Sequence, residues 1–419
     1  MNLKNPASSN PANFHKSAHP IIFFFFQIPY GVFSGYLTIT LAYLFSKSGI
    51  SIAEIAGLAA INIIPQIFKF LWAPIVDTTL SLKKWYLLST VLTAACIFAT
   101  GIVPLKAANL PLFTLMILLS SFARTFVSAS LYGLAAHDTP HELKGQVSGF
   151  GQAGALGGAA IGGGIGLWLA QHTNFFWIPG GALACICLLC CFALLFINEP
   201  KTLIKVEGVK KTLNNLVKDI WLTIRTKRGV LALLLCIIPI GSGASGSLFA
   251  AIASDWNAGA DTVALVTGII AGIVTIMGSL SGGWICDRID RQKSYLIFGF
   301  LQAVSCLGMA ICPHTPLLYM TWTLAYTFSN GLSFAAWTAL CLEATGSGAA
   351  ASKFELFASV SWLPIYSMTA IAGFAYTKWK ANGMLFTEAA CAIVTILVFL
   401  IVKRIISGNK ALNKNVTAV

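Results

Sequence analysis

Charge is scarce in this sequence, and that scarcity argues against a water-soluble fold. Only 10% of the 419 residues are Asp, Glu, Lys or Arg, whereas 57% are hydrophobic and the mean hydropathy is +0.79. Soluble domains carry about 25% charged residues. A helix that crosses a bilayer needs roughly 20 apolar residues, and runs of this kind recur along the chain. We therefore predict an all-α membrane protein.

A cleavable signal peptide is also lacking. Residues 1–19, "MNLKNPASSNPANFHKSAH", are polar and contain prolines. A signal peptide instead begins with a short basic segment and continues into a short apolar core. Because the apolar run that starts at Pro20 extends to about Phe45, we expect a disordered cytoplasmic tail over 1–19 and an uncleaved first span.

No cluster of His, Asp and Glu indicates catalysis or a metal site. The nearest group is His137, Asp138 and His141 in "AAHDTPHELKG", which we expect in a short cytoplasmic loop. Most of the 11 cysteines lie in apolar runs such as "CICLLCC", with neither His nor an acid beside them. We expect no catalytic residue, no metal and no cofactor. A membrane-embedded enzyme or a sensor is the least favoured alternative.

The apolar runs predict twelve transmembrane helices in two pseudo-symmetric six-helix bundles. The bundles cover 20–198 and 229–406; a cytoplasmic linker covers 199–228 and a cytoplasmic tail covers 407–419. The expected spans are 20–45, 52–76, 85–104, 111–136, 147–170, 175–198, 229–253, 261–286, 294–312, 316–342, 353–376 and 383–406.

The 27 Lys and Arg residues outnumber the 14 Asp and Glu residues, which gives a net charge of +13. With both termini cytoplasmic, four of these cations lie in outer loops, two lie inside spans, and the other 21 face the cytoplasm. The positive-inside rule therefore predicts cytoplasmic termini. We expect the lipid bilayer and a small-molecule solute as partners, no nucleic acid, and a monomer.

The two halves of the chain resemble each other. Asp77 and Asp287 end the second and eighth expected spans and are 210 positions apart, as are Ser51 and Asp261 at the starts of the same spans. The offset indicates a duplicated six-helix unit with parallel repeats, an arrangement found in transporters.

A burst of charge follows the second helix of the second repeat, in "GGWICDRIDRQKS". Its pattern, Gly283-x-x-x-Asp287-Arg288-x-x-Arg291-x-Lys293, resembles the loop signature of the major facilitator superfamily. The resemblance implies a gating role. Glycine permits close helix approach, the aspartate suits a neighbouring helix N-terminus, and the arginines suit carboxylates or phosphate. A signal for topology alone is the alternative.

The first copy of this loop departs from the pattern. In "LWAPIVDTTLSLKKW", Ala73 and Pro74 stand where glycine is usual, and no arginine follows Asp77. We therefore expect Asp77 to make a weaker gating contact than Asp287.

Two segments carry a narrower resemblance. "IIPQIFKFLWAPIVDT" at 63–78 and "GLSFAAWTALCLEATGSGAAASKFELFASVSWLP" at 331–364 resemble AmpG-type muropeptide permeases and their acetyl-CoA and siderophore transporter relatives. The resemblance implies proton-coupled solute import across a bacterial inner membrane, without fixing the solute.

The fifth span is rich in glycine and has no proline. Gly154, Gly158, Gly162 and Gly166 recur every four residues in "GFGQAGALGGAAIGGGIGLW", and such spacing permits close helix packing in lipid. The missing glycine-proline motif argues modestly against drug export.

Arg124 falls near the middle of the fourth span, with Ser120 and Ser128 one turn to either side. A cation at that depth costs about 2.5–3.5 kcal/mol on insertion scales, so we expect Arg124 to bind an anionic group of the solute. A structural pairing with a buried acid or with carbonyls is the alternative.

Lys69 shares a helix face with Asn62 and Gln66, at spacings of seven and three residues. We expect these three side chains to bind solute. For Lys69, snorkelling toward the cytoplasmic surface is the alternative.

Other polar and aromatic side chains form stripes on helices that are expected to line a central cavity. Their alternative role is helix packing or membrane-interface anchoring. The candidates for binding solute are Gln27, Tyr30, Tyr326, Asn330, Trp337 and Trp362.

Energy coupling has two candidate carboxylates, Glu388 and Glu355. For Glu388, a position facing the outer membrane interface is the alternative. Proton coupling itself is implied by the resemblance, and uniport is the alternative.

These observations predict a secondary active importer of a small organic solute with a possible anionic group, such as a siderophore or muropeptide-like compound. An exporter, or a lipid or drug efflux permease of the same fold, is the main alternative.

Overall fold

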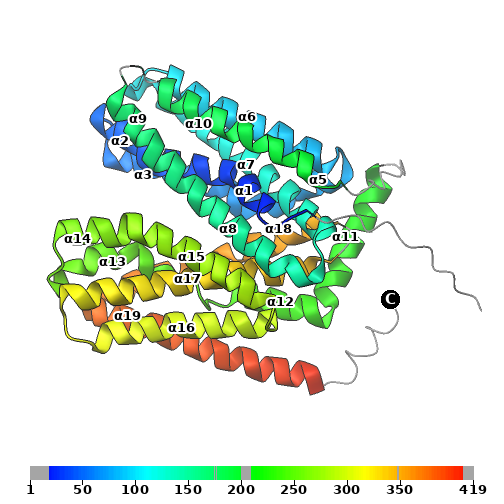
Figure 1. The fold of residues 1–419 in the computed structure, drawn as a ribbon. Helices are drawn as coiled ribbons and strands as arrows, with labels where there is room; N and C mark the ends of the chain where they lie inside the picture. The colour runs from blue at the N-terminus through cyan, green and yellow to red at the C-terminus, as the bar shows by residue number, and fades with distance from the viewer. Residues whose placement is uncertain (1–17, 174, 176, 200–208, 347–348, 409–419) are drawn as a thin grey trace, which may run out of the picture.

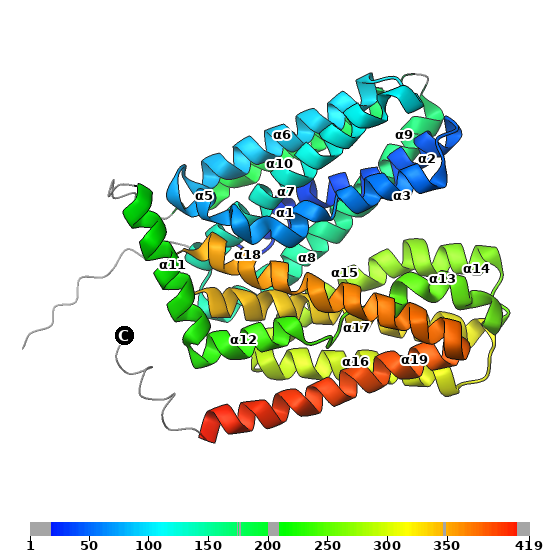
Figure 2. The ribbon, with the colours of Figure 1, turned by 180° about the vertical axis from the view of Figure 1, so that it is seen from behind.

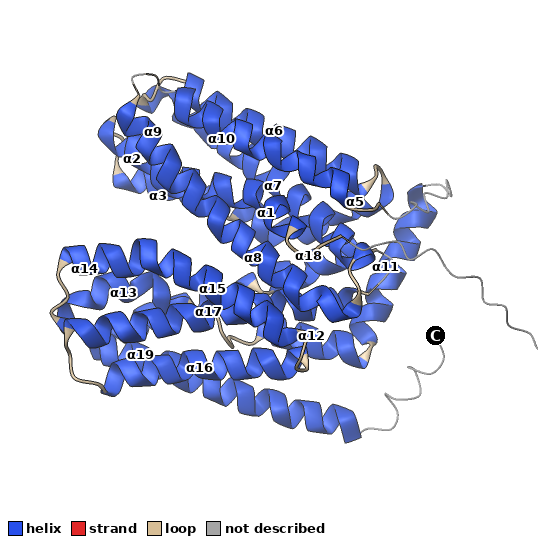
Figure 3. Cartoon of the chain, viewed as in Figure 1, coloured by secondary structure: helices blue, strands red, loops and turns tan. Residues whose placement is uncertain are grey.

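The computed structural model describes residues 18–173, 175, 177–199, 209–346 and 349–408, and these residues are almost entirely helical (Figure 3), with no strand among them. The predicted tails and most of the first third of the linker, at 1–17, 200–208 and 409–419, lie outside the described residues. The all-α prediction is confirmed.

The first bundle contains the segments up to residue 196. They are α1 (Ile22–Gly35), η1 (Tyr36–Leu41), α2 (Ala42–Lys47), α3 (Ile52–Ile61), α4 (Ile64–Phe68), η2 (Lys69–Leu71), α5 (Ala73–Thr78), α6 (Leu82–Ile102), η3 (Ala107–Asn109), α7 (Leu110–Asp138), η4 (His141–Leu143), α8 (Lys144–Ala160), η5 (Ile161–Ile165), α9 (Gly166–His172), α10 (Trp177–Cys190) and η6 (Cys191–Phe196).

The linker contributes one helix, and the second bundle follows it. The elements are α11 (Val209–Arg225) in the linker, then α12 (Lys227–Ile237), η7 (Ala244–Leu248), α13 (Phe249–Ile252), η8 (Ala253–Trp256), α14 (Ala260–Ala264), η9 (Leu265–Ile269), α15 (Ile270–Cys286), α16 (Arg291–Ile311), α17 (Pro316–Thr345), α18 (Ala350–Val360) and α19 (Trp362–Gly408).

Eight helices among the described residues are long and apolar enough to cross a membrane. The difference from twelve has three causes. The second and seventh spans are interrupted, and α17 carries many polar side chains. The last two spans run together through α18 and α19 as one stretch, Ala350–Ile406, that bends at Lys380 with φ 57°. When each interrupted span is counted as one, α17 is included and the last stretch is divided at Lys380, the described elements make the twelve predicted segments.

The seventh span was expected to be continuous over 229–253, and this expectation is wrong. The chain is not helical from Ile238 to Gly243. Pro239 has no backbone N–H to donate, and Gly241 and Gly243 adopt left-handed φ angles of 63° and 70°, which glycine tolerates. Proline also lies at the start of α4 and of α5, where the second span is interrupted.

Local sequence rules account for several helix starts. The Oγ of Ser51 accepts from the backbone N–H of Glu54 at 3.3 Å, and the Glu54 carboxylate accepts from the backbone N–H of Ser51 at 3.0 Å. This reciprocal pair is a capping box, which follows from the Ser-x-x-Glu pattern at the start of α3.

The glycine-rich face of α8 and η5 packs directly on α1. A Cβ at Gly154 would lie 2.1 Å from the carbonyl oxygen of Phe24, and a Cβ at Gly158 would lie 2.4 Å from that of Ile28. No larger residue fits without separating the helices, so the predicted small-residue packing is confirmed.

The two bundles meet near α8, α15, α18 and α11 and diverge toward the opposite end (Figures 1 and 2). The first and last described segments, near Ala18 and at the end of α19, lie at the same end of the molecule as α11. The described part of the linker and the first and last described residues therefore lie at one end of the molecule.

Candidate functional site

A cavity of about 440 Å³ lies between the two bundles and is lined by both. Six of the ten residues predicted to bind solute line it, and four do not. The six are Gln27, Tyr30, Lys69, Asn330, Trp337 and Trp362. The other four are Asn62, Gln66, Arg124 and Tyr326, which are buried behind its walls.

Lys69 forms an ion pair across the bundle interface. Its Nζ lies 2.5 Å from the Glu355 Oε2, and the two side chains are 5% and 0% exposed. Lys69 belongs to η2 in the first bundle and Glu355 to α18 in the second. The snorkelling alternative is therefore wrong, because the ammonium group points to a carboxylate of the other bundle and not to the membrane surface.

Arg124 is buried behind Tyr30 and has no carboxylate partner among the described residues. Its Nη1 donates to the Asn62 Oδ1 at 3.2 Å, and its guanidinium carbon lies 4.2 Å from the centre of the Tyr30 ring and 5.3 Å from that of Phe33. Its Nε has no partner within the described chain. The guanidinium is thus held by one amide and two aromatic faces, one layer away from the cavity.

Asn62 and Gln66 connect the helices of the first bundle. The Tyr30 hydroxyl donates to the Gln66 Oε1 at 3.1 Å, and the Ser121 hydroxyl donates to the Asn62 carbonyl at 2.5 Å. Their side chains position Tyr30 and Arg124, and neither lines the cavity.

Tyr326 and Glu388 form a buried pair inside the second bundle. The Tyr326 hydroxyl donates to the Glu388 Oε1 at 2.7 Å, and the backbone N–H of Ser245, at the start of the second half of the broken helix, donates to Oε2 at 2.9 Å. Glu388 is 4% exposed, so the alternative that it faces the outer interface is wrong. Both of its carboxylate oxygens are occupied by partners of the same bundle.

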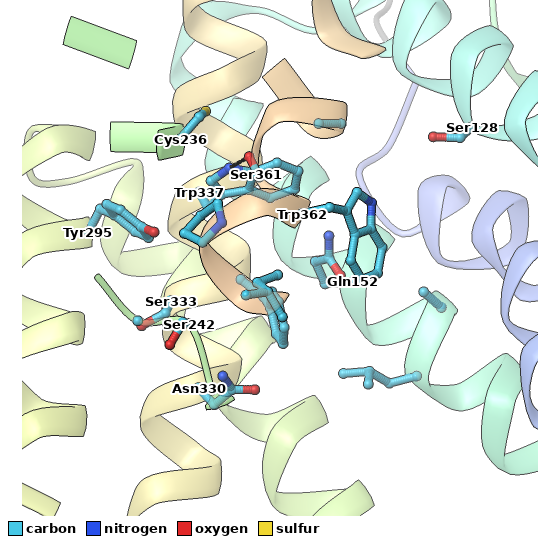
Figure 4. A pocket seen from close by; sticks show the side chains of 18 of the residues that line it. Ser128, Gln152, Cys236, Ser242, Tyr295, Asn330, Ser333, Trp337, Ser361 and Trp362 are labelled. Carbon is cyan, nitrogen blue, oxygen red and sulfur yellow. Dashed lines mark hydrogen bonds between the residues drawn. The ribbon is translucent and has the colours of Figure 1, made fainter. Parts of the chain in front are cut away.

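The wall formed by the second bundle combines aromatic rings and neutral polar groups (Figure 4). The Trp337 Nε1 donates to the Ser361 Oγ at 2.8 Å, while Asn330 and Ser333 face the unwound segment that contains Ser242. These side chains come from α17, from the turn between α18 and α19, and from 238–243.

Asp287 joins the bundles at the α11 end. Its two carboxylate oxygens accept from the backbone N–H groups of Gly145 and Gln146, at 2.7 and 2.9 Å, at the N-terminus of α8. A Cβ at Gly283 would lie 2.4 Å from the Gly145 carbonyl oxygen. The predicted contact of the aspartate with a helix N-terminus and the close approach at glycine are both confirmed.

Asp77 makes the equivalent contact in the opposite direction. Its carboxylate accepts from the backbone N–H of Ala351 at 3.2 Å and from both the N–H and the hydroxyl of Ser352 at 2.8 and 2.6 Å, at the N-terminus of α18. Asp77 thus accepts three hydrogen bonds and Asp287 two, whereas Asp287 alone of the two has a nearby arginine, Arg291. That Asp77 makes the weaker gating contact stays a prediction.

The basic residues of the loop behave differently from one another. Arg291 is 4% exposed and donates to the Glu343 Oε2 at 3.0 Å, and it also contacts the His141 carbonyl and Asp287. Arg288, in the turn after α15, instead lies over Trp284 of that helix, with its guanidinium carbon 3.5 Å from the ring centre. Lys293 is exposed, and its backbone N–H donates to the N-cap residue Asp290. Among the described residues, Arg291 is the one of these three whose side chain contacts the other bundle, at His141.

Several bridging residues escaped the sequence analysis. The Gln152 Nε2 donates to the Thr338 Oγ1 at 2.8 Å, the Lys144 Nζ donates to the Leu342 carbonyl at 3.0 Å, and the Tyr132 ring stacks on Phe354 at 3.8 Å. Lys144 has a sequence signal, since it occupies the loop position equivalent to Lys353 of the second repeat. The others are neutral residues within apolar helices.

The contacts that join the bundles are confined to one part of the molecule. Among the described residues, the hydrogen bonds and ion pairs between the bundles named above lie at the α11 end or around the cavity. The cavity is therefore closed toward α11, and the bundles separate away from it (Figure 1).

Comparison with known proteins agrees with this architecture. A family model described as "Major Facilitator Superfamily" matches residues 21–365. The chain is 24% identical over 357 residues to proteins named anhydromuropeptide permease from Escherichia coli strain K12 and from E. coli O157:H7, in an alignment that covers 81% of this chain and 70% of each relative.

Two solved structures share the fold at low sequence identity. The proton:xylose symporter XylE matches with a TM-score of 0.68 and 14% identity, over 90% of this chain and 93% of that chain. FucP in an outward conformation matches with a TM-score of 0.67 and 14% identity, over 91% and 98%.

Proposed function

The chain belongs to the Major Facilitator Superfamily, and from that premise we propose that it is a proton-coupled importer of a small organic anion. It resides in the inner membrane as a monomer with both termini in the cytoplasm. The cargo enters the central cavity from outside and leaves at the α11 end after the bundles reorient. A muropeptide-like compound or a siderophore is the proposed class of cargo.

One observation carries this proposal: the Lys69–Glu355 ion pair joins the two bundles at the wall of the cavity. A buried ion pair that loses one partner leaves an uncompensated charge, at a cost of about 3–5 kcal/mol. When the bundles separate at this level, both charges need new partners. A proton on Glu355 and an anionic group beside Lys69 satisfy that need together, which couples proton and cargo.

The positive charges around the cavity support an anionic cargo. Lys69 lines the wall directly, and Arg124 lies one layer behind it, under Tyr30. Charges interact strongly where the surroundings are apolar, so Arg124 raises the positive potential of the cavity without contacting the cargo. The name of the E. coli relatives adds support for a muropeptide-like compound.

The contrast between the two buried carboxylates favours Glu355 as the coupling residue. Glu388 is held by Tyr326 and Ser245 of its own bundle, and these partners move with it. Glu355 has its ionic partner on the opposite bundle. Because only an interface contact changes when rigid bundles rock, Glu355 is the better coupling residue and Glu388 the structural one.

The gate contacts support an outward-facing resting state. Asp77 and Asp287 each bind the N-terminus of a helix in the other bundle, and Arg291 binds the His141 carbonyl of the other bundle at the same end. With α11 cytoplasmic, these contacts close the inner side of the cavity.

Uptake by right-side-out membrane vesicles tests this function. Vesicles that contain the protein should accumulate labelled anhydromuropeptide when an inward proton gradient is imposed, and collapse of that gradient should abolish accumulation. Vesicles with the Lys69→Met variant serve as the matched control. Accumulation in inverted vesicles alone would reject import and establish export.

A further inference from the structure

The unwound segment 238–243 meets polar groups of α16 and α17 at the cavity wall. The Tyr295 hydroxyl of α16 donates to the Ile240 carbonyl at 2.5 Å and fixes the segment. A Cβ at Gly241 would lie 2.8 Å from the Ser333 Oγ, and a Cβ at Gly243 would lie 2.3 Å from the Asn330 Nδ2. The two left-handed glycines thus place bare backbone against two side chains of α17.

Several polar side chains beside this segment have hydrogen-bonding atoms without a partner in the described chain. The Ser242 Oγ, the Ser333 Oγ and the Asn330 Nδ2 have no hydrogen-bond partner within the described chain, and neither does the Gln302 Nε2. Ser242 is 9% exposed, Ser333 1% and Gln302 3%. A buried polar group without a partner costs about 1–3 kcal/mol, so such a cluster at a cavity wall indicates a ligand that supplies the partners.

The chemistry of the cluster is neutral. It consists of two hydroxyls and a carboxamide that face the cavity, with a second carboxamide behind them, and it contains no charged side chain (Figure 4). The helix N-terminus nearby is already occupied, because Glu388 accepts from the N–H of Ser245. An anion therefore has no free site there, and neutral donors and acceptors suit hydroxyl groups.

Aromatic rings complete the surroundings. Phe334, Trp337 and Trp362 line the same cavity. A ring that carries hydroxyls at its edges and C–H groups on its faces satisfies both kinds of wall, since aromatic faces accept apolar contact while polar side chains bind the edges.

We propose that Ser242, Asn330 and Ser333 form a subsite for a carbohydrate-like, polyhydroxylated ring of the cargo. This inference rests on the proposed function, since it adds a second recognition element to the anion site at Lys69. The cargo is thereby defined as a compound with a sugar-like ring and an acidic group, with the ring held by the second bundle and the acid drawn toward the first.

Two probes of equal charge separate ring hydroxyls from the acid. D-glucuronate carries a carboxylate on a hydroxylated ring, and cyclohexanecarboxylate carries it on a bare ring. Ligand-observed NMR titrations of the purified full-length protein in detergent measure their affinities without requiring transport. We expect D-glucuronate to bind about tenfold more tightly, the gain expected from one or two additional neutral hydrogen bonds.

Two variants and one matched control locate the selectivity. Ser333→Ala and Asn330→Leu should each remove most of the preference for D-glucuronate. Ser329→Ala, one turn away on α17, should retain it, because the Ser329 hydroxyl already bonds to the Ala325 carbonyl of its own helix. Lys69→Met should weaken both probes by a similar factor and leave their ratio unchanged.

Each outcome bears on one claim. Equal affinities in the wild-type protein, or a preference that survives both α17 variants, would overturn the subsite. If the wild type prefers D-glucuronate but Lys69→Met leaves the affinities for both probes unchanged, the subsite stands and the anion site of the proposed function is rejected. Because the wild-type ratio needs no variant, poor folding of a variant does not hide the result.

Discussion

At the scale of single residues, position relative to the bundle interface separates groups of similar chemistry. Glu355 and Glu388 are both buried carboxylates on helices of the second bundle. One faces a lysine of the other bundle and the other faces partners of its own. The first contact is broken and remade by a rocking motion, whereas the second is carried along unchanged.

Neutralising the two carboxylates should therefore affect different properties: proton coupling at Glu355 and thermal stability at Glu388. Glu355→Gln should abolish proton-driven accumulation of cargo while counterflow exchange continues, because the protonated form is mimicked permanently. Glu388→Gln should keep accumulation and lower thermal stability, because it weakens the bonds to Tyr326 and Ser245. Transport and melting temperature measured on both variants decide the matter; loss of coupling in Glu388→Gln alone would contradict the assignment.

Arg124 offers a second test at this scale. Its guanidinium carbon lies over the Tyr30 ring, and one amide oxygen accepts from it; the compact ammonium group of lysine cannot replace the planar guanidinium there. Arg124→Lys should lower the melting temperature, while Arg124→Gln removes a poorly compensated buried charge and should fold at least as well as the wild type. In both, affinity for an anionic cargo should fall less than in Lys69→Met. A larger loss at Arg124 would place it in direct contact with cargo.

At the scale of elements, helix termini and glycine faces determine where the bundles touch. Asp77 and Asp287 each bind the N-terminus of a helix from the opposite bundle. Asp77 of α5 in the first bundle binds α18 of the second, and Asp287, just after α15 in the second bundle, binds α8 of the first. Both carboxylates meet the positive end of a helix dipole. The duplicated sequence thus builds two copies of one latch.

The two latches should be similarly sensitive. Asp77→Asn and Asp287→Asn should each reduce the population of the state that is closed at the α11 end, and so raise the apparent KM for external cargo several-fold. Asp290→Asn, in the same loop as Asp287, should have little effect, because Asp290 caps its own helix and asparagine caps equally well. A strong effect at Asp290, or none at Asp77, would contradict a pair of latches.

Glycine packing between α1 and α8 gives a second prediction for elements. A Cβ at Gly158 would meet the Ile28 carbonyl at 2.4 Å, whereas a Cβ at Gly164 would meet nothing within 4 Å. Gly158→Ala should therefore lower the melting temperature by several degrees, and Gly164→Ala should leave it unchanged or raise it. Equal effects of the two substitutions would show that the contact does not limit stability.

At the scale of the whole molecule, the sequence predicts the fold well because its signals are periodic and repeated. Hydropathy marks the spans, and the offset of 210 between Asp77 and Asp287 marks the duplication. The glycine contact at Gly283 and the helix N-terminus contact of Asp287 also follow from local chemistry, since both depend on residue type at a known place in a helix.

The site is less predictable, because its pairs are distant in sequence. Lys69 and Glu355 are 286 positions apart, and no local pattern indicates that their helices face each other. Tyr326 and Glu388, which pair within one bundle, are 62 positions apart, and no local pattern indicates their contact either. The unwound segment 238–243 shows a signal in Pro239 and its glycines, but the side chains that gather around it come from other helices.

The central claim is that one cavity between the bundles opens to each side of the membrane in turn. Ser34 lines that cavity from α1, and a Ser34→Cys variant in a cysteine-free background reports its accessibility to a membrane-impermeant thiol reagent. In the otherwise wild-type protein we expect labelling from outside the cell and little from the cytoplasmic side of inverted vesicles. Addition of Asp77→Asn and Asp287→Asn should shift labelling toward the cytoplasmic side. Two results would contradict alternating access: labelling of Ser34→Cys only from the cytoplasmic side in the otherwise wild-type protein, or no shift of labelling when Asp77→Asn and Asp287→Asn are added.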